Sequence, residues 1–403
     1  MVDQKVELKG RIASGFEAVG EAFLANFAEG KEVGASFAMF QHGLPLVDIW
    51  AGHADAAKTR DWEADSIVNV YSTTKGMTAL ALALLVDEGK VDYDAKVTDY
   101  WPEFAAAGKH DITVSILMSH QAGLCGVTER ISLEDLYNWD RMVGLLAAQE
   151  PFWEPGTANG YHAMTYGYLA GEIIARVTGQ TPGNFFRERI AEPLGADFHI
   201  GLPESEDHRV AEMIAPGGGK ASTSGIGQKD DQKDGQKDEK KSGAKIDIKP
   251  PKHFLAALAN PTLTSEEANT RAWRAAEIPA GNGQGNARSV ARVYAMQANG
   301  GELEDVRIIS EDGIAASTRE CCNRKDLILG FGVRWGHGYI LNSKNLYGPV
   351  DNCFGHSGWG GSFGFADLDN GLGVGYVMNQ MDTNVAGDPR GARLIEAVYG
   401  CLR

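Results

Sequence analysis

The sequence predicts an α+β fold: an antiparallel sheet flanked by N- and C-terminal helices, with a mostly helical domain inserted into it. Runs rich in β-branched and aromatic residues, typical of strands, occur near the N-terminus and again in the C-terminal part of the chain. Between them, from residue 72 to about residue 200, apolar residues recur mostly at helical spacing. Strands at both ends of the chain are most simply joined in one sheet, which makes the helical segment an insertion.

The N-terminal elements are an amphipathic helix and a hairpin. The helix is expected over residues 11–29, with apolar residues three and four apart. These residues are Ile12, Phe16, Val19, Phe23 and Phe27. Strand-like runs at 35–40 and 46–50 then flank residues 41–45, whose Gly and Pro are typical of a hairpin connection.

A buried helix is expected to begin at Ser72. Residues 67–71 are β-branched and aromatic, as in an extended segment, and apolar residues follow at helical spacing. These are Met77, Leu80, Ala81, Leu84 and Leu85. Gly89 stands where a C-terminal cap belongs.

The C-terminal part alternates strands with glycine turns between two helices. A helix is expected through Val290, Val293, Tyr294 and Met296, and a final helix over residues 392–399. The expected strands are 328–335, 362–366 and 372–378.

This order of elements predicts two domains. Residues 1–70 and 285–403 would form a discontinuous sheet domain, and residues 71–284 a mostly helical domain. Within the latter, residues 217–251 contain three near-identical Gln-Lys-Asp tetrads and almost no large apolar side chains. Such a segment cannot offset its ordering entropy by burial, so a mobile surface insertion is expected.

Composition restricts the partners. The chain has 403 residues and a net charge of -16, which argues against nucleic acid or an anionic membrane as a partner and leaves a small molecule. The N-terminus lacks a secretory signal pattern and no apolar run is long enough to span a bilayer, so a cytoplasmic location is expected. The five cysteines lack metal-ligand spacing, so we expect reduced thiols and no metal site. No cofactor is expected either. The sequence predicts no particular oligomeric state.

Ser72-Thr73-Thr74-Lys75 carries the most chemical information. Residues three apart on a helix share a face, so the Lys75 amine can reach the Ser72 hydroxyl. The positive end of the helix dipole and burial both disfavour the ammonium, which would make Lys75 a base for a serine nucleophile. The Ser72 backbone N–H is a free donor of the first turn and could face an oxyanion.

The four-residue pattern has competing interpretations. Ser72 could be an N-capping serine followed by a solvated lysine, and Ser242 to Lys245 matches the pattern inside the polar insertion. Gly360-Gly361-Ser362-Phe363-Gly364 fits the G-x-S-x-G nucleophile elbow. An elbow needs a helix after the serine and a later histidine; here a strand follows, and no histidine occurs after His356.

Three motifs together resemble the serine β-lactamase and penicillin-binding-protein superfamily. They are Ser72 to Lys75, Gly160-Tyr161-His162-Ala163, and Gly355-His356-Ser357-Gly358-Trp359-Gly360-Gly361. The chain is most similar to the family VIII carboxylesterases, which look like class C β-lactamases but act on esters. The likeness covers nearly the whole chain, including residues 119–124 and 273–279.

The resemblance assigns a role to each motif. It implies that the Tyr161 phenol relays the proton between Ser72 and the leaving group, although an ordinary core tyrosine is the alternative. Ala163 stands where class C enzymes have an asparagine that holds the substrate's side-chain carbonyl. His356 replaces the lysine of a Lys-Thr-Gly triplet, so the charge that would hold a carboxylate is lost.

Two registers of the third motif stay open. If His356-Ser357-Gly358 is the triplet, the Trp359 N–H is the second oxyanion donor beside that of Ser72, and His356 to Gly360 bind substrate. Trp359-Gly360-Gly361 could instead be the counterpart of the triplet, or the segment could be a glycine-rich edge strand.

The sequence as a whole predicts a serine carboxylesterase that hydrolyses short-chain esters through an acyl-enzyme on Ser72, with proton transfer by Lys75 and Tyr161. The esterase could have a weak β-lactamase side activity. A β-lactamase or D-Ala-D-Ala peptidase-like hydrolase is one alternative. A non-catalytic binding or scaffold protein on the same fold is the other.

Overall fold

The computed structural model describes residues 6–218, 250–384 and 386–402. Most of the predicted insertion at 217–251, together with Ser242 to Lys245, lies outside these residues. No helix in the described part combines the length and the apolar character that crossing a membrane requires.

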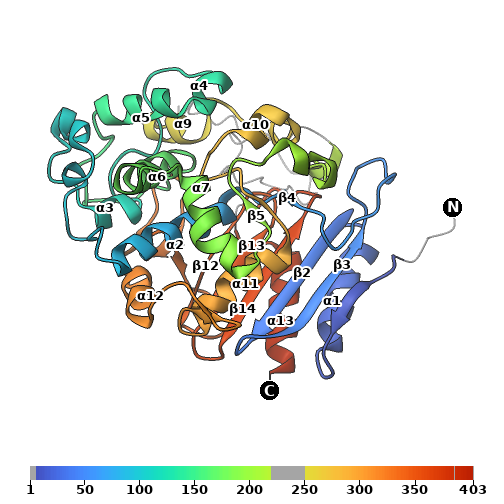
Figure 1. Cartoon of the computed structure of the whole chain (residues 1–403). Helices are drawn as coiled ribbons and strands as arrows, with labels where there is room; N and C mark the ends of the chain where they lie inside the picture. Colours follow the sequence, from blue (N-terminus) through green and yellow to red (C-terminus); the bar gives the residue numbers. More distant parts are fainter. Residues whose placement is uncertain (1–5, 219–249, 385, 403) are drawn as a thin grey trace, which may run out of the picture.

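One antiparallel sheet contains strands from both ends of the chain, as the sequence predicts (Figure 1). Nine described strands pair in the order β1-β3-β2-β14-β13-β12-β11-β10-β9. Their bounds are β1 Lys9–Ile12, β2 Gly34–Gln41, β3 Leu44–Gly52, β9 Cys322–Lys325, β10 Gly332–Trp335, β11 Ile340–Leu341, β12 Cys353–Ser357, β13 Phe363–Asp367 and β14 Leu372–Met378. The predicted domain boundaries, at residues 70/71 and 284/285, stay a prediction.

Smaller strand pairings lie outside the main sheet. A three-stranded sheet has the order β4-β6-β5, and β7 pairs with β8. Their bounds are β4 Val68–Asn69, β5 Phe198–His199, β6 Gln284–Gly285, β7 Glu302–Leu303 and β8 Val306–Arg307. The three-stranded sheet matters for the site because β4 leads directly into Ser72.

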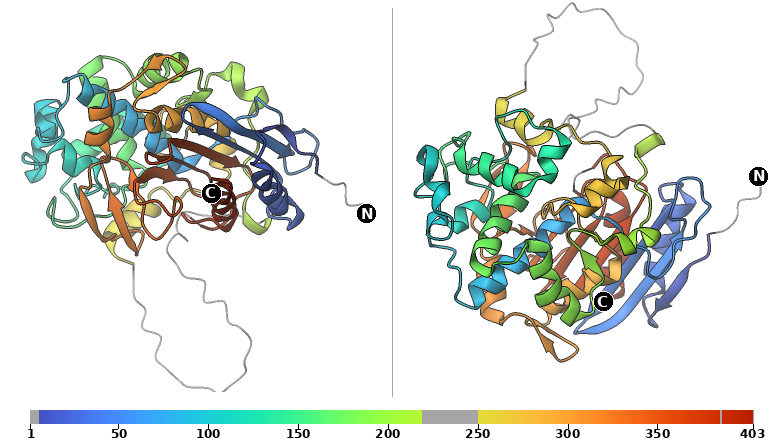
Figure 2. Two further views of the ribbon diagram at one scale, coloured as in Figure 1. Left: turned by 90° about the horizontal axis from the view of Figure 1, so that it is seen from below. Right: turned by 45° about the horizontal axis from the view of Figure 1, so that its top comes forward.

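Helices cover both faces of the main sheet, and the remaining helices gather beside it (Figures 1 and 2). The helix α11 lies on one face, while α1 and α13 pack together on the other. The helices are α1 Glu17–Ala28, α2 Thr74–Asp87, α3 Val114–Met118, α4 Leu133–Tyr137, α5 Trp139–Ala148, α6 Thr165–Thr178, α7 Pro182–Phe186, α8 Glu192–Leu194, α9 Lys252–Leu258, α10 Arg271–Ala275, α11 Ala287–Ala298, α12 Glu311–Thr318 and α13 Pro389–Cys401.

Glycines set the distance between α11 and the sheet. A Cβ on Gly373 of β14 would overlap the backbone of Ala295, and one on Gly364 of β13 would overlap the ring of Tyr294. The helix therefore packs directly on the strand backbones. This close packing carries Tyr294 to α2, where its hydroxyl lies against Gly76.

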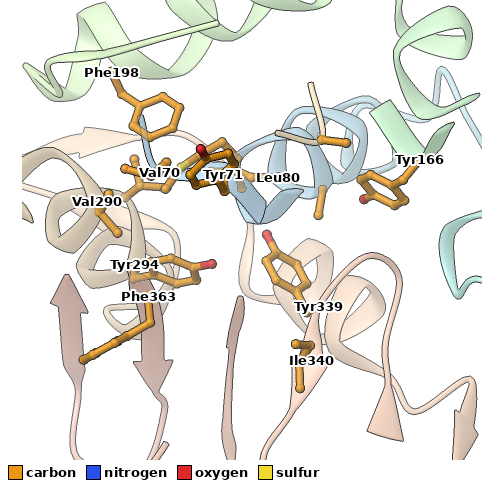
Figure 3. Close-up of a cluster of buried hydrophobic side chains, with 14 of the residues drawn as sticks. Val70, Tyr71, Leu80, Tyr166, Phe198, Val290, Tyr294, Tyr339, Ile340 and Phe363 are labelled. Carbon is orange, nitrogen blue, oxygen red and sulfur yellow. The ribbon is translucent and has the colours of Figure 1, made fainter. Parts of the chain in front are cut away.

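The helix α2 is buried along most of its length. Every residue from Thr74 to Leu85 is buried. Figure 3 shows Tyr166 of α6, Tyr294 of α11 and Tyr339, which precedes β11, gathered around it. Because a helix buried on all sides cannot shift without opening the core, α2 is a rigid platform for the residues at its N-terminus.

Three predictions of secondary structure were wrong in detail. Residues 11–12 end strand β1, and the first helix begins only at Glu17. Ile12 does contact the helix, but from strand β1: its Cδ1 packs against Gly20 of α1, 2.5 Å from where a Cβ on Gly20 would lie. Its spacing therefore matched the apolar face of α1 although it is not part of that helix. Residues 328–331 form a turn before β10, and β12, offered as an edge strand, lies inside the sheet between β11 and β13.

Candidate active site

Ser72 lies in a sharp turn between β4 and α2. Tyr71, just before it, has φ of +44°, a conformation that non-glycine residues rarely adopt. A short 3-10 turn over Tyr71–Thr73 leads into α2. The Thr74 hydroxyl secures the turn by donating to the Tyr71 carbonyl at 2.5 Å and accepting from the Gly283 N–H at 2.9 Å.

The Ser72 hydroxyl lies between the amine of Lys75 and the phenol of Tyr161. Lys75 Nζ is 3.1 Å from Ser72 Oγ, and the Tyr161 hydroxyl donates to the same oxygen at 2.6 Å. The alternative of a capping serine with a solvated lysine is wrong: neither Tyr71–Thr73 nor α2 has a side-chain cap, and Lys75 is 0% exposed. The structure thus brings together all three side chains that the sequence singled out.

Lys75 is surrounded by carbonyl oxygens. Nζ donates to the carbonyls of Ala163 at 2.6 Å and Ala280 at 2.8 Å. No carboxylate forms an ion pair with it among the described residues. Burial therefore lowers the pKa of Lys75 well below its usual value, because no nearby negative charge offsets the loss of hydration.

Tyr161 is fixed by its ring and by its backbone. The ring stacks on Trp335 with centroids 5.9 Å apart and planes 8° apart. The Tyr161 N–H donates to the buried carboxylate of Asp326 at 3.0 Å. Burial raises the pKa of the phenol, which keeps the hydroxyl a neutral donor at physiological pH.

The third motif forms the end of β12 and the turn into β13. The Gly361 N–H donates to the Gly358 carbonyl at 3.1 Å, which closes a β-turn with Trp359 and Gly360 at its centre. Gly360 has φ of +94°, as the third position of a type II turn requires. Gly358 lies directly against the Val70 carbonyl, where any side chain would clash.

Two side chains tie this turn to the turn that carries Ser72. The Trp359 ring meets the Tyr71 ring edge to face, with centroids 5.2 Å apart. The buried Ser362 hydroxyl donates to the Val70 carbonyl at 2.8 Å and lies 3.0 Å from the Thr73 hydroxyl. Ser362 is therefore a bridge between the two turns, and a strand follows it where the nucleophile elbow requires a helix.

His356 is buried beside the tyrosine. Its ring centroid is 6.1 Å from that of Tyr161, and its Nδ1 lies 2.9 Å from the Ser357 carbonyl. Since a carbonyl only accepts, Nδ1 carries the proton and Nε2 is left as an acceptor. Burial, reinforced by Lys75, lowers the pKa of His356 to about 3, so the imidazole is neutral at physiological pH.

These residues border a cavity without charged side chains. The cavity has a volume of about 100 Å³. No Asp, Glu, Lys or Arg is among the described residues that line it. Its apolar walls come from α5, α9 and the segments around them, and its lining includes Tyr71, Ser72, Tyr161, Ala163, His356, Ser357 and Trp359.

Two parts of this site were missed by sequence reasoning. Asp326 accepts from the Asn159 amide at 2.9 Å and from the N–H groups of Tyr161, Ile328 and Leu329. It thereby joins the tyrosine to the loop before β10, yet a single aspartate in a polar run gives no signal. The Ala280 carbonyl is a backbone group, which residue identity does not reveal. In the described part of the chain, no cluster of three or more His, Cys, Asp or Glu could hold a metal.

Comparisons with known proteins agree on one family. The family model described as Beta-lactamase matches residues 18–399. Esterase/beta-lactamase LipL of Mycobacterium tuberculosis is 35% identical over 91% of this chain and 81% of its own length. Esterase EstB of Burkholderia gladioli is 26% identical, with 92% of both chains covered.

Solved structures extend the similarity to the whole fold. The crystal structure of a family VIII carboxylesterase has a TM-score of 0.89 at 53% identity, covering 98% of this chain and all of the other. A penicillin-binding protein homologue from Caulobacter crescentus has a TM-score of 0.86 at 40% identity, covering 98% of this chain and 100% of its own. The predicted fold class and the predicted resemblance are both confirmed.

Proposed function

Because this chain belongs to the Beta-lactamase family, we propose that it is a serine carboxylic ester hydrolase that works through an acyl-enzyme on Ser72. One observation carries the proposal: the Ser72 hydroxyl is held between a buried amine and a buried phenol beside a cavity without charge. The names of the similar proteins, an esterase/beta-lactamase, an esterase and a family VIII carboxylesterase, point the same way.

Lys75 is the base for acylation in this proposal. A neutral amine has two N–H groups and one lone pair, and the carbonyls of Ala163 and Ala280 accept both N–H groups. The lone pair is then left for Ser72 Oγ, 3.1 Å away. As Oγ bonds to the ester carbonyl carbon, its proton passes to Nζ.

Tyr161 completes the proton route. When the bond to the leaving alcohol breaks, the alkoxide takes the phenol proton, and the Lys75 ammonium replaces it. Nζ lies 4.7 Å from the centre of the Tyr161 ring, so the Lys75 ammonium and the transient Tyr161 phenolate stay close together. In the second half-reaction water attacks the acyl carbonyl and gives its proton to the same pair. The acid departs as Ser72 recovers its proton.

The oxyanion is assigned to the backbone N–H groups of Ser72 and Trp359. Neither group donates a hydrogen bond to any other group within the described residues. Both turns are rigid, so the two donors would be fixed before the charge develops, which is the condition for effective stabilisation of a transition state.

The substrate class follows from the missing charges. The cavity offers no cation for a carboxylate, and His356 is neutral at physiological pH. We therefore assign uncharged esters as substrates, bound against His356, Ser357, Gly358, Trp359 and Gly360, with the short acyl groups that the sequence predicts. Ala163 supplies no amide for the side chain of a β-lactam.

A panel of hydrolysis assays tests the proposal. p-Nitrophenyl acetate should be turned over, p-nitrophenyl palmitate poorly, and a cephalosporin with a free carboxylate far more slowly than the acetate. Ser72→Ala should abolish all activity. Comparable turnover of the cephalosporin and the acetate would favour a β-lactamase. Failure of a fluorophosphonate probe to label Ser72 in the folded protein would favour a binding or scaffold role.

A further inference from the structure

A buried arginine lies directly behind the turn that holds the proposed oxyanion donor. Arg390, on the first turn of α13, is 2% exposed. Its Nη2 donates to the Gly360 carbonyl at 2.7 Å. The Asp382 N–H donates to the same carbonyl at 2.9 Å, and the Gly360 N–H donates to the Asn384 carbonyl at 3.1 Å. The central peptides of the turn are thus held from outside the cavity.

The guanidinium is itself held on every side. Its Nε and Nη2 donate to the two oxygens of Asp388, at 3.0 and 2.7 Å. Its Nη1 donates to Glu32 at 3.2 Å and to the carbonyls of Lys31 at 3.0 Å and Gln380 at 2.7 Å. A planar group with all its donors engaged has one orientation, so it transmits a fixed position to Gly360.

The shape of the turn depends on this contact. Gly361 has φ of +128°, and a Cβ there would overlap Asp388 and come 2.6 Å from Arg390 Nη2. The turn therefore packs flat against the ion pair. The Gly360 carbonyl belongs to the last peptide of the turn and the Trp359 N–H to its first, and the Gly361 N–H to Gly358 carbonyl bond closes the turn between them. Displacement of the Gly360 carbonyl would therefore distort the closed turn and reorient the peptide that carries the Trp359 N–H.

We propose that Arg390, oriented by Asp388, is a positioning residue that aims the Trp359 N–H at the developing oxyanion through its hydrogen bond to the Gly360 carbonyl. The inference rests on the proposed ester hydrolase function. Arg390 touches no reacting atom. Its effect is therefore expected in the transition state, where the oxyanion forms, and not in the binding of the ester.

Arg390→Lys is the first test. Lysine keeps the positive charge, but its single ammonium cannot replace the planar fork that spans Asp388 and Gly360. We expect kcat on p-nitrophenyl acetate to fall by about 10- to 100-fold, as for a misplaced catalytic group, with KM changed less than about threefold. A boronic acid that forms a tetrahedral adduct should lose affinity in parallel.

Arg393→Lys is the matched control. Arg393 lies one turn further along α13 and contacts Asn26 and Glu29 of the α1 region, away from the Gly360 turn. Its kcat and boronic acid affinity should match those of the wild type. If both variants lose kcat equally, general loosening of α13 explains the effect and the inference is wrong.

Asp388→Asn serves if Arg390→Lys does not fold. Asparagine keeps the cap of α13 but loses the charge that orients the guanidinium. Here too kcat and boronic acid affinity should fall while KM changes little, and the fall in kcat should be smaller than for Arg390→Lys. A folded variant of either kind that retains wild-type kcat and boronic acid affinity refutes the positioning role alone. A wild-type protein without esterase activity refutes the proposed function instead.

Discussion

Tyr161→Phe isolates the proposed proton relay, because it removes only the phenol oxygen that donates to Ser72 Oγ at 2.6 Å. The phenyl ring keeps its stacking on Trp335, and the backbone bond to Asp326 is unaffected. Ester binding should therefore change little. A positioned acid–base group contributes about 10²- to 10⁴-fold, so kcat should fall by that factor, equivalent to about 3–5 kcal/mol.

The choice of ester separates relay from packing. p-Nitrophenyl acetate releases a stable anion that needs no proton, whereas ethyl acetate releases an alkoxide that must be protonated. If Tyr161 delivers that proton, the fall in kcat/KM should be at least about tenfold larger on ethyl acetate than on p-nitrophenyl acetate. Both rates can be followed in one pH-stat assay of acetic acid release.

Tyr166→Phe is the control for this experiment. Tyr166 is a buried tyrosine of α6 whose hydroxyl has no hydrogen-bond partner in the described part of the chain. Its variant should keep wild-type rates on both esters. An equal loss on the two esters for Tyr161→Phe, or a loss below about threefold on ethyl acetate, would refute the relay.

Three further predictions follow from burial and close packing. Lys75 must be neutral to act as a base and its pKa is lowered, so kcat/KM should rise with pH and level off well below pH 10.5; a midpoint near 10.5 would contradict the mechanism. Burial raises the pKa of Glu32 from 4.5 to about 8, despite Arg390. Between pH 5 and 8 the unfolded chain has already lost the Glu32 proton that the folded protein keeps, so unfolding releases a proton. The wild type should therefore lose up to about 4 kcal/mol of unfolding free energy across this range. Glu32→Gln should show no such loss when its unfolding free energy is measured with denaturant across the same pH range. An equal pH dependence of the unfolding free energy in the two proteins would contradict the assignment. Gly373→Ala should cost about 1–3 kcal/mol or more in urea unfolding, because its Cβ would overlap the α11 backbone. Gly332→Ala on β10, with open space around it, should cost less than about 1 kcal/mol.

Long periodic segments were predictable because their own side chains determine their structure. The strand expected at 372–378 coincides with β14, and the helix expected after Ser72 is α2. The short strands β9 and β11 were not predicted, because their pairing depends on neighbours far away in the sequence. Ile12 was misplaced for a related reason: its contact with α1 is real but comes from another element.

The site divides in the same way. Ser72 and Lys75 are three residues apart on one turn, so local geometry alone suggested their contact. Tyr161 needed the resemblance, because nothing near it in the sequence indicates that it lies beside Ser72. Asp326 and Arg390 gave no signal, because their roles are hydrogen bonds to the backbone of other segments.

The chemistry assigned to Lys75 depends on its surroundings more than on the four-residue pattern. A solvated lysine three residues after a serine would keep its charge and could not accept a proton. Here α2 is buried, and the carbonyls of Ala163 and Ala280, from two distant segments, engage the amine without neutralising an ammonium. The absence of a carboxylate partner for Lys75 in the described structure therefore matters as much as the serine beside it, since a paired lysine would have its ammonium stabilised. A base at this position requires burial without a counter-charge.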